Sequence, residues 1–253
     1  MIDSTERFSS RVEDYIKYRP GYPAAILDLL NDKCGLTTAS VVADIGSGTG
    51  ILTELFLRNG NPVFAVEPNR EMREAAEQLL SKYPNFTSIS GTAEGTTLKE
   101  QSVNIVTASQ AFHWFDRERA RREFLRILKP GGWVVLIWNN RDLVSPLAKA
   151  YEHLLRTFGT DYDEVKHKHT DDQVIASFFT VNGYQKADFP NSQLFDLGGL
   201  KGRLLSSSYA PEPGHPKHIP MLEALHALFS EHQTKGKVTF EYTTMVYYGQ
   251  LSV

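Results

Sequence analysis

A glycine-rich turn is the segment of this chain whose residue types most clearly indicate chemistry. It reads Asp44-Ile45-Gly46-Ser47-Gly48-Thr49-Gly50 and separates an apolar run typical of a strand (41–45) from a helical pattern (51–59). Glycine lets the backbone turn sharply and approach a ligand where a Cβ atom would clash. The N-terminus of the following helix offers free N–H groups to a carboxylate or phosphate. The turn therefore predicts a ligand-binding site.

The spacing of the glycines distinguishes two kinds of ligand. A dinucleotide-binding turn needs its third glycine at position 51, which Ile51 occupies. Asp44, at the end of the strand, would be a poor neighbour for a pyrophosphate. It suits a ligand with a positive charge, such as an ammonium or a sulfonium. An NAD(P)-dependent oxidoreductase is therefore the less favoured alternative.

A second acidic residue, Glu67, stands at the end of the next apolar run, in Val66-Glu67-Pro68-Asn69. A carboxylate at this place can accept hydrogen bonds from both hydroxyls of a ribose. The alternative is an acid placed there because the dipole of the following helix favours it. The glycine turn upstream favours the ribose interpretation.

The elements that must position these residues alternate along the first half of the chain. Apolar runs predict strands at 41–45, 62–66, 86–90, 103–108 and 133–138, and amphipathic patterns predict helices at 23–30, 51–59, 70–82 and 119–128. This alternation is typical of βαβ units around a parallel sheet, whose strands are buried on both faces. Ligands of such sheets bind at the carboxyl ends of the strands.

The second half of the chain breaks this rhythm. It predicts helices at 146–158, 172–179, 199–207 and 220–233, a strand within 185–196 and a closing strand at 238–250. We therefore expect a single domain over residues 1–253. Its parts are a cofactor-binding core with an N-terminal lid segment (1–142), an inserted helical substrate cap (143–182 and 198–236) and a closing strand (237–253).

Bulk composition excludes some classes of protein. Hydrophobic residues make up 41% and charged residues 23%, as in globular proteins. The net charge of -3 gives no field that would gather nucleic acid. The absence of a membrane-length apolar run and of a signal-peptide pattern, together with the single Cys34, predicts a cytoplasmic protein without a membrane partner. The sequence leaves the oligomeric state open.

Several motifs in their order along the chain resemble one known family. Besides the glycine turn and Val66-Glu67-Pro68-Asn69, they are Tyr18-Arg19-Pro20-Gly21-Tyr22-Pro23, Gly91-Thr92-Ala93-Glu94, Gln110-Ala111-Phe112-His113-Trp114-Phe115-Asp116 and Leu128-Lys129-Pro130-Gly131-Gly132. Together they resemble the class I S-adenosylmethionine-dependent methyltransferases, in the small-molecule branch similar to trans-aconitate methyltransferase-like proteins. The resemblance extends from about residue 8 to residue 139 and is weaker in the inserted helices.

This resemblance implies a fold and an activity. The fold is α/β, a doubly wound, mostly parallel seven-stranded sheet of the Rossmann-like methyltransferase type, with the last strand antiparallel and inserted helices over the site. The cofactor is S-adenosyl-L-methionine, and a small-molecule acceptor receives the methyl group, for example on a carboxylate or hydroxyl oxygen. A non-catalytic regulatory protein that binds the same cofactor is the alternative from another class, because fold alone does not give function.

The resemblance also implies the roles of the cofactor-site residues. The turn from Gly46 to Gly50 packs against the methionine part, Glu67 holds the ribose and Pro68 lies against the adenine. Further cofactor contacts are implied for these residues: Tyr18, Arg19, Asp44, Thr92, Ala93, Glu94, Ser109, Gln110 and Ala111. Relatives commonly have aspartate at the position of Thr92. Tyr18 and Arg19 are expected in a lid, or alternatively in a structural turn set by Pro20-Gly21.

The acceptor pocket has fewer candidates. Phe112 and Trp114 follow the fourth predicted strand and can line a dry site, and Tyr209 lies in the inserted part. Arg203 either clamps an acidic substrate, since guanidinium binds carboxylate with two hydrogen bonds, or forms a surface salt bridge.

His113 is the candidate general base, with a role in shaping the loop as its alternative. The scattered histidines lack metal-ligand spacing, so no metal site is expected.

Overall fold

The computed structural model describes residues 12–162, 172–179 and 183–252. Parts of the expected lid (1–11) and of the expected cap (163–171 and 180–182) lie outside the described residues. The helices and strands are α1 (Val12–Tyr18), α2 (Ala25–Cys34), β1 (Val42–Ile45), α3 (Ile51–Arg58), β2 (Val63–Val66), α4 (Arg70–Leu80), β3 (Phe86–Ile89), β4 (Val103–Ser109), the 3₁₀ turn η2 (Phe112–Trp114), α5 (Arg117–Ile127), β5 (Leu128–Arg141), α6 (Pro146–Phe158), α8 (Asp172–Phe179), β6 (Gln185–Phe195), α9 (Leu197–Leu205), α10 (His218–His232) and β7 (Val238–Gly249).

The strands form one sheet. Its seven described strands have the order β3-β2-β1-β4-β5-β7-β6. Strands β1 to β5 pair in parallel, and β7 runs antiparallel to both of its neighbours, β5 and β6. The prediction of a mostly parallel seven-stranded sheet with an antiparallel last strand is confirmed. The strand order reverses between β1 and β4, which is where ligands bind in open α/β sheets.

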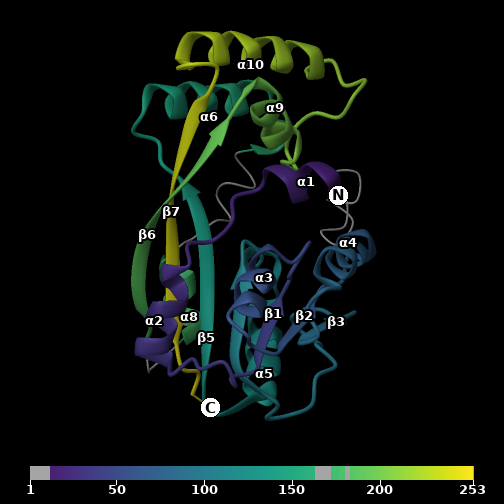
Figure 1. Ribbon diagram of the computed structural model, residues 1–253, viewed down its shortest axis with the longest axis vertical. Helices are drawn as coiled ribbons and strands as arrows, with labels where there is room; N and C mark the ends of the chain where they lie inside the picture. Colours follow the sequence, from purple (N-terminus) through teal and green to yellow (C-terminus); the bar gives the residue numbers. More distant parts are fainter. Residues whose placement is uncertain (1–11, 163–171, 180–182, 253) are drawn as a thin grey trace.

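Helices cover both faces of this sheet (Figure 1). On one face, Ile26 of α2, Phe56 of α3 and Leu80 of α4 pack with strand residues in one apolar core. On the other face, Phe124 of α5 and Phe178 of α8 belong to a second core. All four residues of β1 are buried, as expected for a strand covered on both faces.

A cap of helices stands above the sheet. The long strands β5, β6 and β7 continue out of the sheet into this upper part, where α6, α9 and α10 lie (Figure 1). Their apolar side chains form a third core of their own, to which Phe195 of β6 and Phe240 of β7 contribute. The cap is therefore built on strands that begin in the cofactor-binding core.

The N-terminal segment connects the core with the cap. The sequence predicted a lid here but not helix α1, which packs on α9. A Cβ atom on Gly202 would lie 1.9 Å from the ring of Tyr18, so this glycine makes room for the tyrosine. Arg19 Nη2 donates to the carbonyl of Ser206 at 2.8 Å. The segment is thereby fixed beneath the cap.

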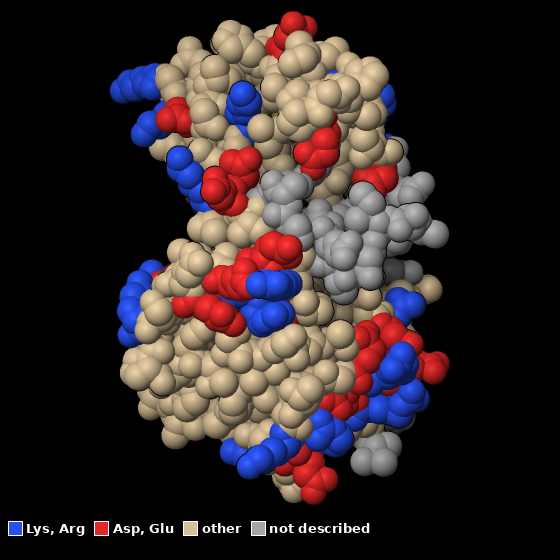
Figure 2. All heavy atoms as spheres, turned by 90° about the vertical axis from the view of Figure 1, so that its right-hand side faces the viewer, with Lys and Arg blue, Asp and Glu red and all other residues tan. Residues whose placement is uncertain are grey.

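The surface carries both signs of charge. On the face shown in Figure 2, lysine and arginine side chains lie interspersed with aspartate and glutamate. No helix within the described ranges has the length and hydropathy to cross a membrane. The expectations about nucleic acid and about location remain predictions.

Candidate active site

The glycine turn lies between β1 and α3, at the carboxyl edge of the sheet. Gly46, Gly48 and Gly50 all have left-handed backbones, with φ of +66°, +57° and +85°. A Cβ atom on Gly46 would lie 2.6 Å from Cβ of Ala111, and one on Gly50 would lie 2.5 Å from Cδ1 of Leu80. A Cβ atom on Gly48 would meet nothing within 4 Å. Packing thus requires two of the glycines, whereas Gly48 faces open space.

Glu67 lies directly beside this turn, as the sequence predicted. Its Oε2 accepts a hydrogen bond from the backbone N–H of Gly48, and its Oε1 accepts one from that of Asn69, both at 2.8 Å. Burial raises the pKa of the Glu67 carboxyl, although these two amides and the charge of Arg73 oppose the rise. The turn and the glutamate therefore form one site.

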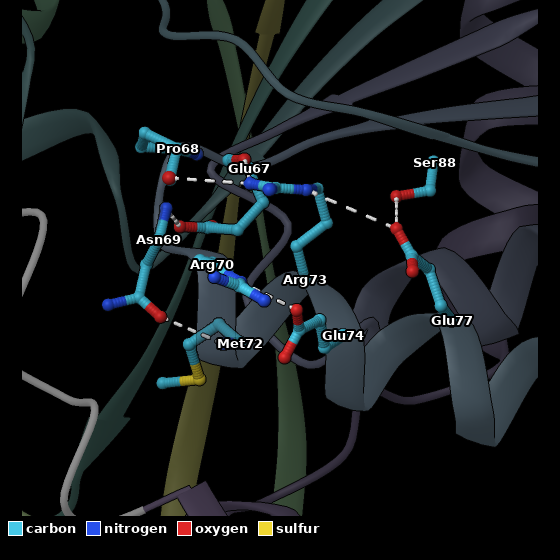
Figure 3. A network of polar contacts seen from close by, with 9 residues as sticks. All are labelled: Glu67, Pro68, Asn69, Arg70, Met72, Arg73, Glu74, Glu77 and Ser88. Atoms are coloured by element: carbon cyan, nitrogen blue, oxygen red, sulfur yellow. Dashed lines mark hydrogen bonds and ion pairs between the residues drawn. The ribbon is translucent and has the colours of Figure 1, made fainter.

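The start of α4 fixes the position of Glu67 (Figure 3). Asn69 caps the helix, and its side chain accepts from the N–H of Met72 at 2.8 Å. Arg73 Nη1 donates to the carbonyl of Glu67 at 3.0 Å, and its Nε lies 4.0 Å from Oε1 of Glu77. Pro68 lies in the short link between the glutamate and the cap residue.

Asp44 lies beneath the turn and is fully buried. Its carboxylate accepts from the hydroxyl of Thr53 at 2.6 Å and from that of Thr107 at 3.0 Å. Burial raises its pKa to about 6, against the opposing effect of the two hydroxyl groups. In this structure Asp44 ties β1 to α3 and β4, and its contact with a cationic ligand stays a prediction.

Replacing Asp44 with asparagine should change how stability depends on pH. The folded state favours the neutral acid, so the contribution of Asp44 is present below pH 4 and is lost as the pH rises through its pKa of about 6. A rise of the Asp44 pKa from 3.8 to about 6 corresponds to a change of at most about 3 kcal/mol in the free energy of unfolding. Relative to the wild type, Asp44→Asn should gain stability in urea unfolding as the pH rises from about 4 to about 6, and the difference should then stay constant up to pH 8. The exposed Asp116→Asn is the control, and parallel profiles for wild type and Asp44→Asn would contradict the assignment.

The segments after β3 and β4 border the same edge. Thr92 is exposed and pairs with Gly95 through their backbones, Ala93 is buried, and Glu94 Oε1 accepts from the N–H of Asp116 at 2.8 Å. Gln110 has a left-handed backbone, with φ of +53°, and its Nε2 donates to the carbonyl of Asn139 at 3.2 Å. Ser109 ends β4 beside Gln110.

The structure corrects the assignments of Phe112 and Tyr18. Phe112 is 3% exposed and packs edge-to-face on Phe178 and Trp138 in the core, so it does not line the acceptor pocket. Tyr18 packs on α9, because Gly202 leaves room for its ring.

A cavity of about 410 Å³ lies between the core and the cap. Ile51, Gln110, His113 and Trp114 line it from the core, and Tyr15, Arg19 and Tyr22 line it from the N-terminal segment. From the cap side it is lined by Arg141, Glu152, Tyr162, Arg203, Tyr209 and Tyr242. The predicted residues Arg19, Gln110, His113, Trp114, Arg203 and Tyr209 therefore meet around one space.

Three guanidinium groups gather at this cavity, which we name the arginine cluster: Arg19, Arg141 and Arg203. Arg203 is 7% exposed, so the surface salt bridge considered for it is wrong. Its Nε donates to the hydroxyl of Tyr242 at 3.3 Å, and its Nη1 donates to that of Ser207 at 3.1 Å. These bonds fix the guanidinium in the cavity wall.

The arginine cluster has an excess of positive charge. Among the described residues that line the cavity, Glu152 alone carries a carboxylate. Burial alone would raise the pKa of Tyr209, but Arg141, Arg203 and Arg19 together lower it below its usual value. The buried atoms Arg19 Nε, Arg141 Nε and Tyr151 Oη have no hydrogen-bond partner among the described residues. Buried donors without partners are costly, and at Arg19 and Arg141, which line the cavity, such donors suit an acceptor atom of a ligand.

The sequence did not identify Arg141, Glu152 or Tyr162. The one signal in the sequence was the four-residue spacing of Glu152 and Arg156, which is typical of an ion pair on a helix. The described residues contain no group of three or more histidine, cysteine, aspartate or glutamate side chains that could hold a metal ion.

The residues around the glycine turn fit the expected cofactor. Ser47 Oγ and Thr49 Oγ1 are buried and have no hydrogen-bond partner in the described part of the chain. They lie on either side of Gly48, which faces open space beside Glu67. The carboxylate of Glu67 suits the hydroxyls of a ribose, and the hydroxyls of Ser47 and Thr49 suit an amino acid group of the same molecule.

Comparisons with known proteins agree with this geometry. Residues 43–136 match a family model described as a methyltransferase domain. An uncharacterized methyltransferase-like protein of Schizosaccharomyces pombe is 29% identical over 95% of this chain and 93% of its own length. An uncharacterized methyltransferase of the same organism is 36% identical, and that match spans 58% of each protein.

A solved structure shares the fold. The protein from Anaeromyxobacter dehalogenans, described as a type II methyltransferase, superposes with a TM-score of 0.69 at 19% identity. The match covers 93% of this chain and 100% of that one.

Proposed function

We propose that the chain is a class I S-adenosylmethionine-dependent methyltransferase and that it methylates a small acceptor that carries a carboxylate. S-adenosyl-L-methionine supplies a methyl group already activated on a sulfonium. The cofactor would be held at the turn by Ser47, Gly48 and Thr49 and at its ribose by Glu67. Pro68, Thr92, Ala93 and Glu94 are proposed to border the adenine.

The observation that supports an anionic acceptor is the charge of the arginine cluster. Among the described residues that line the cavity, Arg19, Arg141 and Arg203 share the wall with one carboxylate, that of Glu152. Guanidinium groups bind carboxylates through short, charge-assisted hydrogen bonds. A carboxylate would also meet the unpartnered donors of Arg19 and Arg141. A neutral acceptor would leave these charges unbalanced.

The chemistry asked of the chain is mainly positioning. Fixing two reactants in a productive geometry contributes roughly 7–11 kcal/mol in favourable cases. The cavity connects Gln110 and Trp114, at the cofactor edge, with Arg203 and Tyr209 in the cap. A carboxylate oxygen is already a nucleophile and needs no base. For a hydroxyl acceptor, His113 is the proposed general base, because it lines the same cavity.

Calorimetry tests the cofactor part of this proposal. S-adenosylmethionine or S-adenosylhomocysteine should bind, and NAD should not bind comparably. Glu67→Gln should weaken binding by about 1–3 kcal/mol, as for a lost charged hydrogen-bond partner. Unchanged affinity in this variant would remove Glu67 from the site. A screen of small carboxylic acids and phenols for transfer of a radiolabelled methyl group then tests the acceptor class.

Some finer predictions remain proposals. They are the trans-aconitate-like branch, the cytoplasmic location, the domain boundaries and the absence of metal and nucleic acid from the function. No observation in the structure favours the oxidoreductase or the non-catalytic alternative.

A further inference from the structure

Glu152 is a buried acid beside Arg141, one member of the arginine cluster. It lies on α6 and is 8% exposed. Its Oε2 accepts from Nη2 of Arg141 at 2.6 Å and from the hydroxyl of Tyr162. Its Oε1 accepts from Nε of Arg156 at 3.2 Å. One carboxylate thus connects the end of β5 with the cap.

These contacts fix Arg141 from two sides. Its Nη2 is bound by Glu152 and lies 3.0 Å from the hydroxyl of Tyr162. Its guanidinium lies over the ring of Tyr151, with Cζ 4.9 Å from the centroid. The buried Nε has no hydrogen-bond partner among the described residues. The arrangement therefore leaves Nε as the donor that a ligand can use.

We propose that Glu152 is a positioning residue that orients Arg141 for the acceptor carboxylate, with Tyr162 as its support. This inference rests on the proposed function. An arginine side chain has many rotamers, and holding it in one of them before binding removes an entropic cost from the binding step. Glu152 acts through Arg141 and does not itself contact the acceptor.

A competing role predicts the opposite sign. If Glu152 only offset the charge of the arginine cluster, Glu152→Gln would remove a repulsive carboxylate and strengthen the binding of an anion. If Glu152 orients Arg141, the same variant weakens that binding, although the cavity becomes more positive. Tyr162→Phe keeps the charge of Glu152 and removes one hydroxyl, so a mere counter-charge predicts no effect of this variant.

The probes are benzoate and its neutral isostere benzamide, titrated into the full chain in the presence of S-adenosylhomocysteine. Glu152→Gln should bind benzoate about 5- to 30-fold more weakly than the wild type. Tyr162→Phe should bind it about 2- to 10-fold more weakly. In an Arg141→Gln background, Glu152→Gln should cause no further loss, because the effect passes through Arg141. Stronger benzoate binding by Glu152→Gln would overturn the proposal.

Glu123→Gln is the matched control. Glu123 is 9% exposed, lies on α5 and accepts hydrogen bonds from Arg126 and from the hydroxyl of Thr96. It is not among the described residues that line the cavity. This variant should lose stability to a similar degree and keep its affinity for benzoate. Equal loss of benzoate binding in both variants would assign a purely structural role to Glu152.

A second readout needs no ligand. The Nη2 protons of Arg141, which donate to Glu152 and Tyr162, should be assigned with Arg141→Lys in a ¹⁵N–¹H spectrum and should exchange more slowly in the wild type than in Glu152→Gln. Unchanged exchange would contradict the positioning role. If benzoate binds no better than benzamide to the wild type, the anionic acceptor fails, whereas the exchange experiment still decides the role of Glu152.

Discussion

Replacing Gly48 with leucine should weaken cofactor binding strongly and leave the fold intact. A Cβ atom on Gly48 meets nothing within 4 Å, so the new side chain enters the space beside the turn and does not disturb the core. It fills the volume in which the cofactor is proposed to lie. Overpacking of a well-fitted space costs about 1–3 kcal/mol, so we expect up to a roughly hundredfold weaker binding of S-adenosylhomocysteine in calorimetry.

The control for this variant must carry the same backbone strain. Gly48 has φ of +57°, where a side chain costs roughly 1–2 kcal/mol. Gly131 has φ of +75° and open space around its Cβ position, and it lies in the turn within β5, away from the site. Gly131→Leu should lose similar stability and bind the cofactor normally. If Gly48→Leu binds as well as Gly131→Leu, the open space belongs to solvent and the site lies elsewhere.

The core of the fold could be predicted because local patterns and tertiary structure agree there. The glycine turn, the first four strands and their helices depend on apolar runs and on residues whose backbone demands are local. Glu67 meets Gly48 since the carboxyl ends of neighbouring parallel strands share one edge. The sequence order of strands and helices was therefore enough to place these two residues together.

The cap could not be predicted in the same way. The fifth strand was expected over 133–138 but extends to Arg141, because pairing with β7 continues as far as Tyr242. This extension brings Arg141 into the cap, where Glu152 and Tyr162 meet it. Phe112 was expected in the pocket but lies in the core, because nothing in the local sequence distinguishes a pocket aromatic residue from a core one. In both cases, contacts between residues far apart in the sequence decide the position.

Replacing Arg203 with methionine is the second change with a large expected effect. It should preserve or raise the stability of the protein and impair acceptor binding. The guanidinium is buried near Arg19, whose pKa is lowered first by burial and then by the charge of Arg203. The mutual repulsion costs stability in the unliganded protein. Replacing buried charged groups with apolar side chains of similar size is often neutral or stabilising. Arg203→Met should therefore unfold at the same temperature as the wild type or at a higher one.

The same substitution should impair acceptor recognition. Hydrogen bonds to charged groups contribute about 1.5–3 kcal/mol, so the acceptor KM should rise roughly 10- to 100-fold. The affinity for S-adenosylhomocysteine should not change, because Arg203 lines the cavity from the cap side. Lys201→Met on the exposed side of the same helix is the control and should leave both constants as they are. A destabilised Arg203→Met protein with a normal acceptor KM would show that this arginine serves the fold, since a group kept for binding an anion costs stability until the anion arrives.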